Sequence, residues 1–123
     1  MGGFIIMINV CENSELRFFV QVMIAMSPNL FSQEFKINGI NQQGKTLCLQ
    51  VARDMVRLFG IPRSEAVGRI NREWKNAQQF LNSKLVFHTD SEECAKNLYY
   101  EDGTWWWVKE WMAENTPKAK PYP

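Results

Sequence analysis

Three side chains of the kinds found in nucleophilic enzymes lie close together in the sequence: His88, Asp90 and Cys94. On an extended strand His88 and Asp90 would point to the same side, and Cys94 follows in a segment that reads as a capped helix. The positive end of a helix dipole lowers the pKa of a nearby thiol, which makes a Cys-His-Asp nucleophile the basis of a small-enzyme hypothesis. A lone histidine beside a turn is more often a hydrogen-bonded structural residue. We therefore expect no catalytic residues.

The metal-binding residue types are widely scattered. His88 is the only histidine, and the three cysteines, Cys11, Cys48 and Cys94, form no C-x-x-C pair. Structural zinc sites need ligands at short, characteristic spacings, so the sequence predicts no metal site and no cofactor. Separated cysteines indicate free thiols in a reducing compartment, which predicts a cytoplasmic protein.

A second group of residues suits phosphate binding. Residues 53–75 hold six basic and three acidic residues, a local charge of +3. Two predicted helices, at 46–59 and 64–76, are joined by Gly60-Ile61-Pro62-Arg63 in the layout of a helix-turn-helix. The match is partial, because Arg69 stands where that motif buries an apolar residue, and a plain helical hairpin with a solvated basic face is the more common arrangement. A nucleic-acid-binding protein is thus an alternative, and its contacts would come from Arg63, Arg69, Arg72 and Lys75.

The most informative group is an aromatic cluster near the C-terminus, which holds four of the five tryptophans. Its members are Tyr99, Tyr100, Trp105, Trp106, Trp107 and Trp111. Three adjacent tryptophans cannot all face one way on a helix or a strand, so at least one is exposed or covered by another chain. Exposed Trp and Tyr are typical of binding and oligomer surfaces. In the alternative interpretation, Trp105 and Trp107, or Trp107 and Trp111, complete the core while Trp106 lies under the lysine stems of the tail.

These observations favour a non-enzymatic interaction module. The cluster would serve self-association, with a homo-dimer as the first expectation, or would hold a small apolar ligand or a protein partner. The formal net charge of +1 provides no overall attraction to nucleic acid or to an anionic membrane. Residues 84–103, with five acidic and two basic residues, carry a local charge of −3 that could pair with the basic segment within the fold or between subunits.

The predicted architecture is a mainly α, single compact domain with a few short strands, and a small α+β fold is the alternative. The length of 123 residues suits one domain over residues 1–114, followed by an extended tail over 115–123 that buries almost nothing. Apolar spacing predicts helices near residues 14–26, 46–59, 64–80 and 91–100, with the tryptophan segment packed against them. Short strands are predicted at 35–37 and 85–89, and residues 105–112 suit a helix or a strand.

Neither apolar run near the N-terminus predicts a membrane span or a signal peptide. The run from Leu16 to Met26 is well short of the ~20 residues that cross a bilayer. The run from Phe4 to Val10 has no basic segment before it and no small-residue cleavage site after it.

Two segments and one histidine resemble a group of small bacterial proteins, including proteins carried on integron gene cassettes. The segments are SEAVGRINREW at residues 64–74 and LYYEDGTWWW at residues 98–107, and the histidine is His88. That group has no assigned activity, so the resemblance implies no functional residue and only a bacterial, cytoplasmic protein. The first forty or so residues carry no such resemblance.

Overall fold

The computed structural model describes residues 28–123, and the helix predicted near residues 14–26 lies outside them. The described elements are α3 (Pro28–Glu34), α4 (Gln42–Phe59), α5 (Arg63–Trp74), α6 (Gln78–Leu81), the 3-10 helix η1 (Lys84–His88), α7 (Ser91–Tyr99) and α8 (Lys109–Glu114). Within this part of the chain the only β pairing is one isolated antiparallel bridge between Tyr100 and Ala119. The mainly α prediction is confirmed here, and the α+β alternative is wrong for these residues.

Helix α4 is the central element. It begins at Gln42, earlier than predicted, because Asn41 has extended backbone and its side-chain oxygen accepts a 2.9 Å bond from the Gly44 amide. Thr46, the first residue of the predicted helix, is instead a buried residue inside it. The helix ends at Gly60, as predicted, in the left-handed conformation with φ of 66°.

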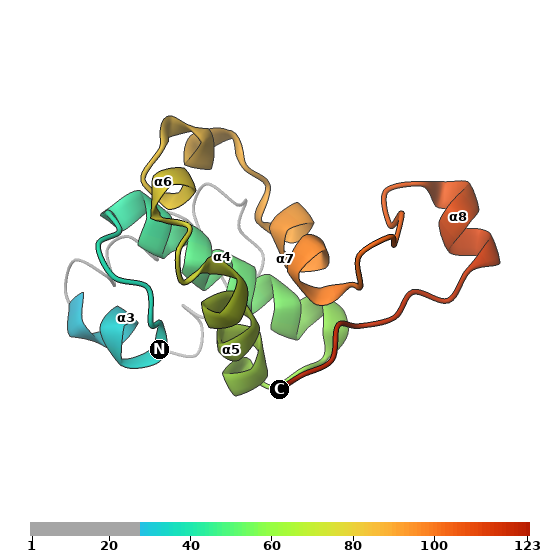
Figure 1. Cartoon of the computed structure of the whole chain (residues 1–123), viewed down its shortest axis with the longest axis horizontal. Helices are drawn as coiled ribbons and strands as arrows, with labels where there is room; N and C mark the ends of the chain where they lie inside the picture. The colour runs from blue at the N-terminus through green and yellow to red at the C-terminus, as the bar shows by residue number, and fades with distance from the viewer. Residues whose placement is uncertain (1–27) are drawn as a thin grey trace, which may run out of the picture.

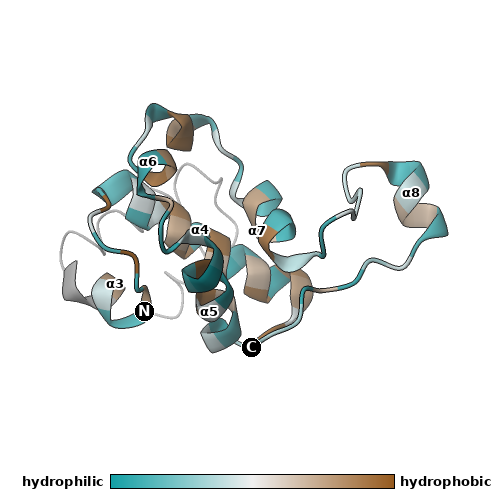
Figure 2. Cartoon of the chain, in the orientation of Figure 1, coloured by the Kyte–Doolittle hydropathy of each residue, from teal (hydrophilic) through white to brown (hydrophobic). Residues whose placement is uncertain are grey.

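The core forms where α5 and α7 pack on α4 (Figure 2). From α4 it takes Leu47, Cys48, Val51, Ala52 and Met55; from α5 and α7 it takes Ala66, Val67, Ile70, Ala95 and Leu98. On α4 these positions recur every three or four residues, the spacing of one helix face. Burial of that face against two helices fixes the positions of α5 and α7.

The predicted strand at residues 35–37 is a loop. Side-chain amides take the place of a neighbouring strand: the Lys36 amide donates to Asn71 Oδ1 at 2.8 Å, and Asn71 Nδ2 donates to the Glu34 carbonyl at 3.1 Å. Phe35 and Ile37 are nevertheless buried. The alternating apolar residues therefore reflect burial and not strand pairing.

The predicted strand at residues 85–89 is also wrong, because this segment forms η1. Hydroxyl groups satisfy its backbone locally: Ser83 Oγ accepts from the Leu85 amide at 3.2 Å, and Thr89 Oγ1 donates to the Leu85 carbonyl at 2.6 Å. Of its residues only Val86 is buried, while Leu85 and Phe87 are exposed. The helix predicted over 64–80 is likewise divided, into α5 and α6.

Residues 101–118, which we call the arm, leave the helical body after α7 and return to it. Figure 1 shows α8 standing apart from the other helices at the far end of the arm. The base is closed by two backbone bonds, from the Glu101 amide to the Lys118 carbonyl at 2.9 Å and from the Lys120 amide to the Tyr99 carbonyl at 2.8 Å. None of the residues of α8 is buried. The expectation that the tryptophan segment packs against the helices is therefore wrong for α8.

The last residues of the chain are extended, as predicted, but they are packed and not free. Arg72 Nη1 donates to the Pro121 carbonyl at 2.8 Å, and the Tyr122 ring lies over the Arg69 guanidinium. The C-terminus thereby ends beside α5 (Figure 1). None of the residues 115–123 is buried, and the contacts that this tail makes on α5 are with residues remote in sequence.

Candidate functional site

The aromatic cluster divides into two parts with different surroundings. Tyr99 stacks on Phe59 of α4, with ring centroids 3.8 Å apart and planes at 6°. Tyr100 meets the same phenylalanine edge to face, at 5.3 Å and 74°. Both tyrosines are thus held by the helical body, and burial raises the pKa of the Tyr100 phenol, which keeps it neutral.

The four tryptophans of the aromatic cluster lie on the arm. Trp105 and Trp107 are 53% and 63% exposed, whereas Trp106 and Trp111 are partly covered. The expectation that adjacent indoles cannot all be buried is confirmed. The alternative in which Trp105 and Trp107, or Trp107 and Trp111, complete the core is wrong, because Trp107, common to both pairs, is exposed.

Trp106 attaches the base of the arm to α7. Its indole Nε1 donates to Asn97 Oδ1 at 2.9 Å, and Lys96 Nζ lies 5.2 Å from the centroid of its ring. The lysine over this ring comes from α7, and not from the tail as the alternative interpretation expected. Asn97 was not singled out in the sequence, where nothing distinguishes it from other exposed polar residues of a helix.

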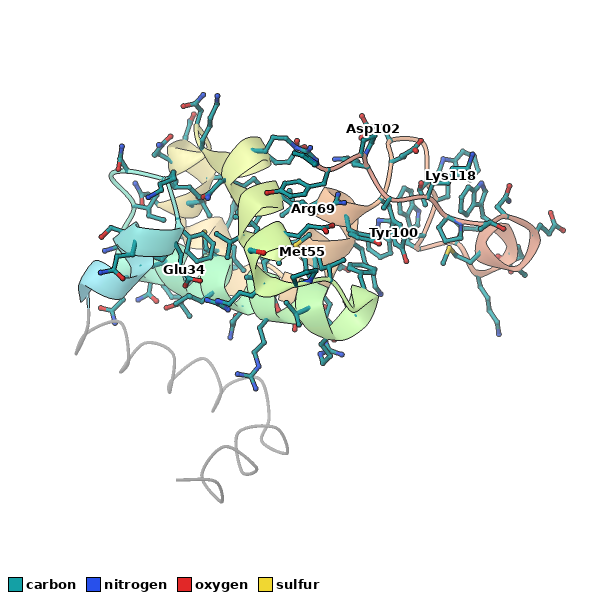
Figure 3. The ribbon with its side chains drawn as sticks, turned by 90° about the horizontal axis from the view of Figure 1, so that it is seen from below. Glu34, Met55, Arg69, Tyr100, Asp102 and Lys118 are labelled. Carbon is teal, nitrogen blue, oxygen red and sulfur yellow. The ribbon has the colours of Figure 1, made fainter. Side chains whose placement is uncertain are left out.

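A small pocket of about 210 Å³ lies between α7 and the base of the arm. Its lining comprises Lys96, Asn97, Tyr100, Glu101, Asp102, Gly103, Thr104, Trp106 and Trp107. Figure 3 shows Tyr100, Asp102 and Lys118 together at this base, with α8 beyond them. The volume is below the ~300–1,000 Å³ of pockets for drug-sized ligands, so only a small group would fit. Three members of the aromatic cluster, Tyr100, Trp106 and Trp107, thus line one pocket together with two acidic residues, Glu101 and Asp102.

Most of the basic residues of the nucleic-acid hypothesis have partners within the protein. Arg63 makes two bonds to Glu34, at 2.8 and 2.9 Å, which lower the pKa of that carboxyl. Arg69 is only 3% exposed and pairs with Glu65, and Arg72 pairs with the tail. Lys75 is exposed at the end of α5. No contact in the described residues favours nucleic-acid binding, which stays a hypothesis.

The two segments of opposite charge do meet within the fold. Arg57 Nη2 lies 3.1 Å from Glu92 Oε2 and 3.2 Å from Asp54 Oδ1. This contact joins the end of α4 to the start of α7. Pairing between the basic and acidic segments within a single chain therefore includes the contact of Arg57 with Glu92.

The residues of the enzyme hypothesis are not arranged as an activated thiol. Asp90 caps α7, since its side chain accepts from the Glu92 amide at 2.8 Å, and His88 is exposed on η1. Burial raises the pKa of the Cys94 thiol to about 12, and the nearby carboxylates of Asp90 and Glu93 add to this effect. The expectation that the helix dipole lowers this pKa is wrong, because desolvation and like charge outweigh the dipole.

The described part of the chain contains no group of three or more His, Cys, Asp and Glu side chains placed to hold a metal ion. Among the same residues, no helix combines the length and apolar composition that crossing a membrane requires. Comparison with known proteins finds no family, no curated protein and no solved structure that matches this chain, so the resemblance to small bacterial proteins stays a prediction.

Proposed function

We propose that this protein is a non-enzymatic interaction module that self-associates through its arm. The observation that carries the proposal is the exposure of Trp105 and Trp107 on a segment that projects from the helical body. An indole buries ~150–250 Å² when it is covered, and Trp is among the residues that contribute most at protein interfaces. Covering these two exposed rings on association would contribute strongly to the free energy of binding.

The form of the arm supports the same proposal. Helix α8 has only six residues and buries none of them. A helix of this length is marginal in water without tertiary packing, so docking on a second surface would stabilise it. Association would cover the apolar rings and order the helix at the same time.

A second copy of the chain is the partner we propose. A formal net charge of +1 leaves little repulsion between copies. Two-fold symmetry is the most common form of self-association, and it lets the same surface of each arm contact its counterpart. The exposed Leu85 and Phe87 on η1 form a second apolar surface, away from the arm.

Sedimentation velocity over a hundredfold range of concentration tests the proposal. We expect the wild-type protein to form a dimer that dissociates on dilution. Trp105→Ala should be a monomer at the same concentrations, and its circular dichroism spectrum should be unchanged. Phe87→Ala is the matched control, since it removes an exposed ring from η1 and leaves the arm intact. A wild-type protein that is monomeric at every concentration would overturn the proposal, as would association that survives Trp105→Ala.

A further inference from the structure

The residues that line the pocket at the base of the arm include aromatic and acidic residues. The rings of Trp106 and Trp107 stand at 87° to each other with centroids 5.5 Å apart, and Tyr100 contributes a third ring to the lining. Glu101 and Asp102 line the same pocket. Ring faces attract cations through their quadrupole, and carboxylates attract them by charge. We infer that this pocket binds an alkylammonium group, the chemistry shared by a small quaternary amine and a methylated lysine side chain.

The angle between the indoles decides between two kinds of ligand. Planar ligands such as nucleobases stack best on one exposed ring face or between parallel rings. Two perpendicular rings instead form a corner, which presents aromatic surface to a compact, rounded group from two directions. The volume of about 210 Å³ suits a head group of this size.

The chain itself already places an ammonium group on this aromatic surface. Lys96 Nζ lies 5.2 Å from the centroid of the Trp106 ring, and Lys96 also lines the pocket. This contact indicates that the indole accepts a cation in its present orientation. Lys96 would therefore compete with an incoming ammonium group for the ring and for the carboxylates.

The carboxylate of Asp102 is available to a ligand. Its side chain is fully exposed, and its ion pair with Lys120 is long, at 3.8 Å. Lys120 Nζ has closer partners elsewhere, Glu73 Oε1 at 3.2 Å and the Asn97 carbonyl at 3.3 Å. A cation in the pocket could thus pair with Asp102 without breaking the bonds that hold Lys120.

The pocket is also held in place before any ligand arrives. The bond from Trp106 Nε1 to Asn97 fixes one wall to α7, and the bridge between Tyr100 and Ala119 joins the two backbone segments at the base. Gly103, with φ of 87°, forms a turn between Asp102 and Thr104, which both line the pocket. A preformed site loses less conformational entropy when it binds its ligand.

Titration of the tryptophan fluorescence with choline and with 3,3-dimethyl-1-butanol tests the inference. The second compound is the neutral carbon isostere of choline, so it has the same shape without the charge. We expect saturable binding of choline, and binding of the isostere that is weaker by about fivefold or more. No binding of choline, or equal binding of the two compounds, would overturn the inference.

Three variants test the roles of the charges. Asp102→Asn should weaken choline binding about threefold or more, whereas Lys96→Met should strengthen it, because the competing ammonium is removed. Glu114→Gln is the control, since that carboxylate lies on α8 and does not line the pocket. Weaker binding by Lys96→Met, or an equal loss in Asp102→Asn and Glu114→Gln, would contradict a cation site.

The same assay distinguishes the two possible sources of the ammonium group. It also tests whether the pocket binds its ligand independently of self-association. Tighter binding of acetyl-trimethyllysine amide than of choline would assign the pocket to a protein side chain, and the reverse order would assign it to a small amine. Trp105 does not line the pocket, so Trp105→Ala should keep choline binding even where it abolishes self-association. Loss of one property without the other thus tells which of the two proposals has failed.

Discussion

The ring of Tyr122 lies over the guanidinium of Arg69, with the guanidinium carbon 5.3 Å from the ring centroid. The Tyr99 ring lies 4.9 Å from the same carbon, and Glu65 Oε2 accepts bonds of 2.9 Å from Arg69. Arg69 Nη1 is buried without a hydrogen-bond partner among the described residues. A buried cation with one carboxylate partner depends on such ring faces to offset its lost hydration. The penultimate residue is therefore part of the folded structure.

Removal of the Tyr122 ring should destabilise the protein. We expect Tyr122→Ala to lower the free energy of unfolding by about 1–2 kcal/mol, because the ring covers Arg69 and also lies near Arg72. Urea unfolding followed by circular dichroism measures this change. Tyr122→Phe is the control, since it keeps the ring and removes only the hydroxyl. Equal losses in the two variants would show that the ring is not the stabilising group.

Gly68 and Tyr122 should be coupled. A Cβ atom at Gly68 would lie 1.8 Å from the Tyr122 hydroxyl oxygen, so alanine there must displace the ring. Within a helix, alanine is otherwise more favourable than glycine by about 1 kcal/mol. We therefore expect Gly68→Ala to stabilise the Tyr122→Ala variant by about that amount and to give no such gain in the wild type. A double-mutant cycle of unfolding free energies measures the coupling, and equal gains in both backgrounds would contradict the packing.

The ion pair between Arg63 and Glu34 should make stability depend on pH in the acid range. The hydrogen bonds from Arg63 hold the pKa of Glu34 below its ordinary value of 4.5, against the opposing effect of burial. A carboxyl with a lowered pKa in the folded state stabilises that state above its unfolded pKa, and the contribution is lost as the pH falls through the folded pKa.

Wild-type protein should therefore exceed Glu34→Gln in unfolding free energy at pH 7, and the two should converge in strong acid. Urea unfolding between pH 7 and pH 3 measures the difference. Glu110→Gln, which removes a carboxylate from α8 that forms no ion pair with the described residues, should differ from the wild type by the same small amount throughout. A constant gap for Glu34→Gln would contradict the link to Arg63.

The two described thiols should be unreactive in the folded protein. Burial raises the pKa of Cys48 and of Cys94 to about 12, so each holds on the order of a thousandfold less thiolate at neutral pH than a free cysteine. In a Cys11→Ser background, which leaves only these two, we expect slow reaction with Ellman's reagent at pH 8 and rapid reaction in urea. His88→Ala should leave the slow rate unchanged. Fast native labelling that depends on His88 would instead support the enzyme hypothesis.

Local patterns in the sequence determined the helical body. The apolar spacing from Leu47 to Phe59 predicts α4, and Gly60 ends it because a left-handed backbone favours a residue without Cβ. The spacing that begins near Ser64, and the polar residues before Cys94, likewise predict most of α5 and α7. In each case the pattern that predicts the helix spans only a few residues, because the contacts that define a helix join residues close in sequence.

Tertiary structure alone decided how these elements meet the rest of the chain. The loop at 35–37 is not a strand because Asn71, far away in sequence, bonds its backbone. Arg69 is buried and not on a solvated face because Tyr122 returns over it. The aromatic cluster divides because Phe59 holds Tyr99 while Asn97 turns Trp106 toward α7 and leaves Trp105 in water. Residue types and local spacing show which side chains can make such contacts, but the partner is set by contacts between distant segments that local periodicity does not encode.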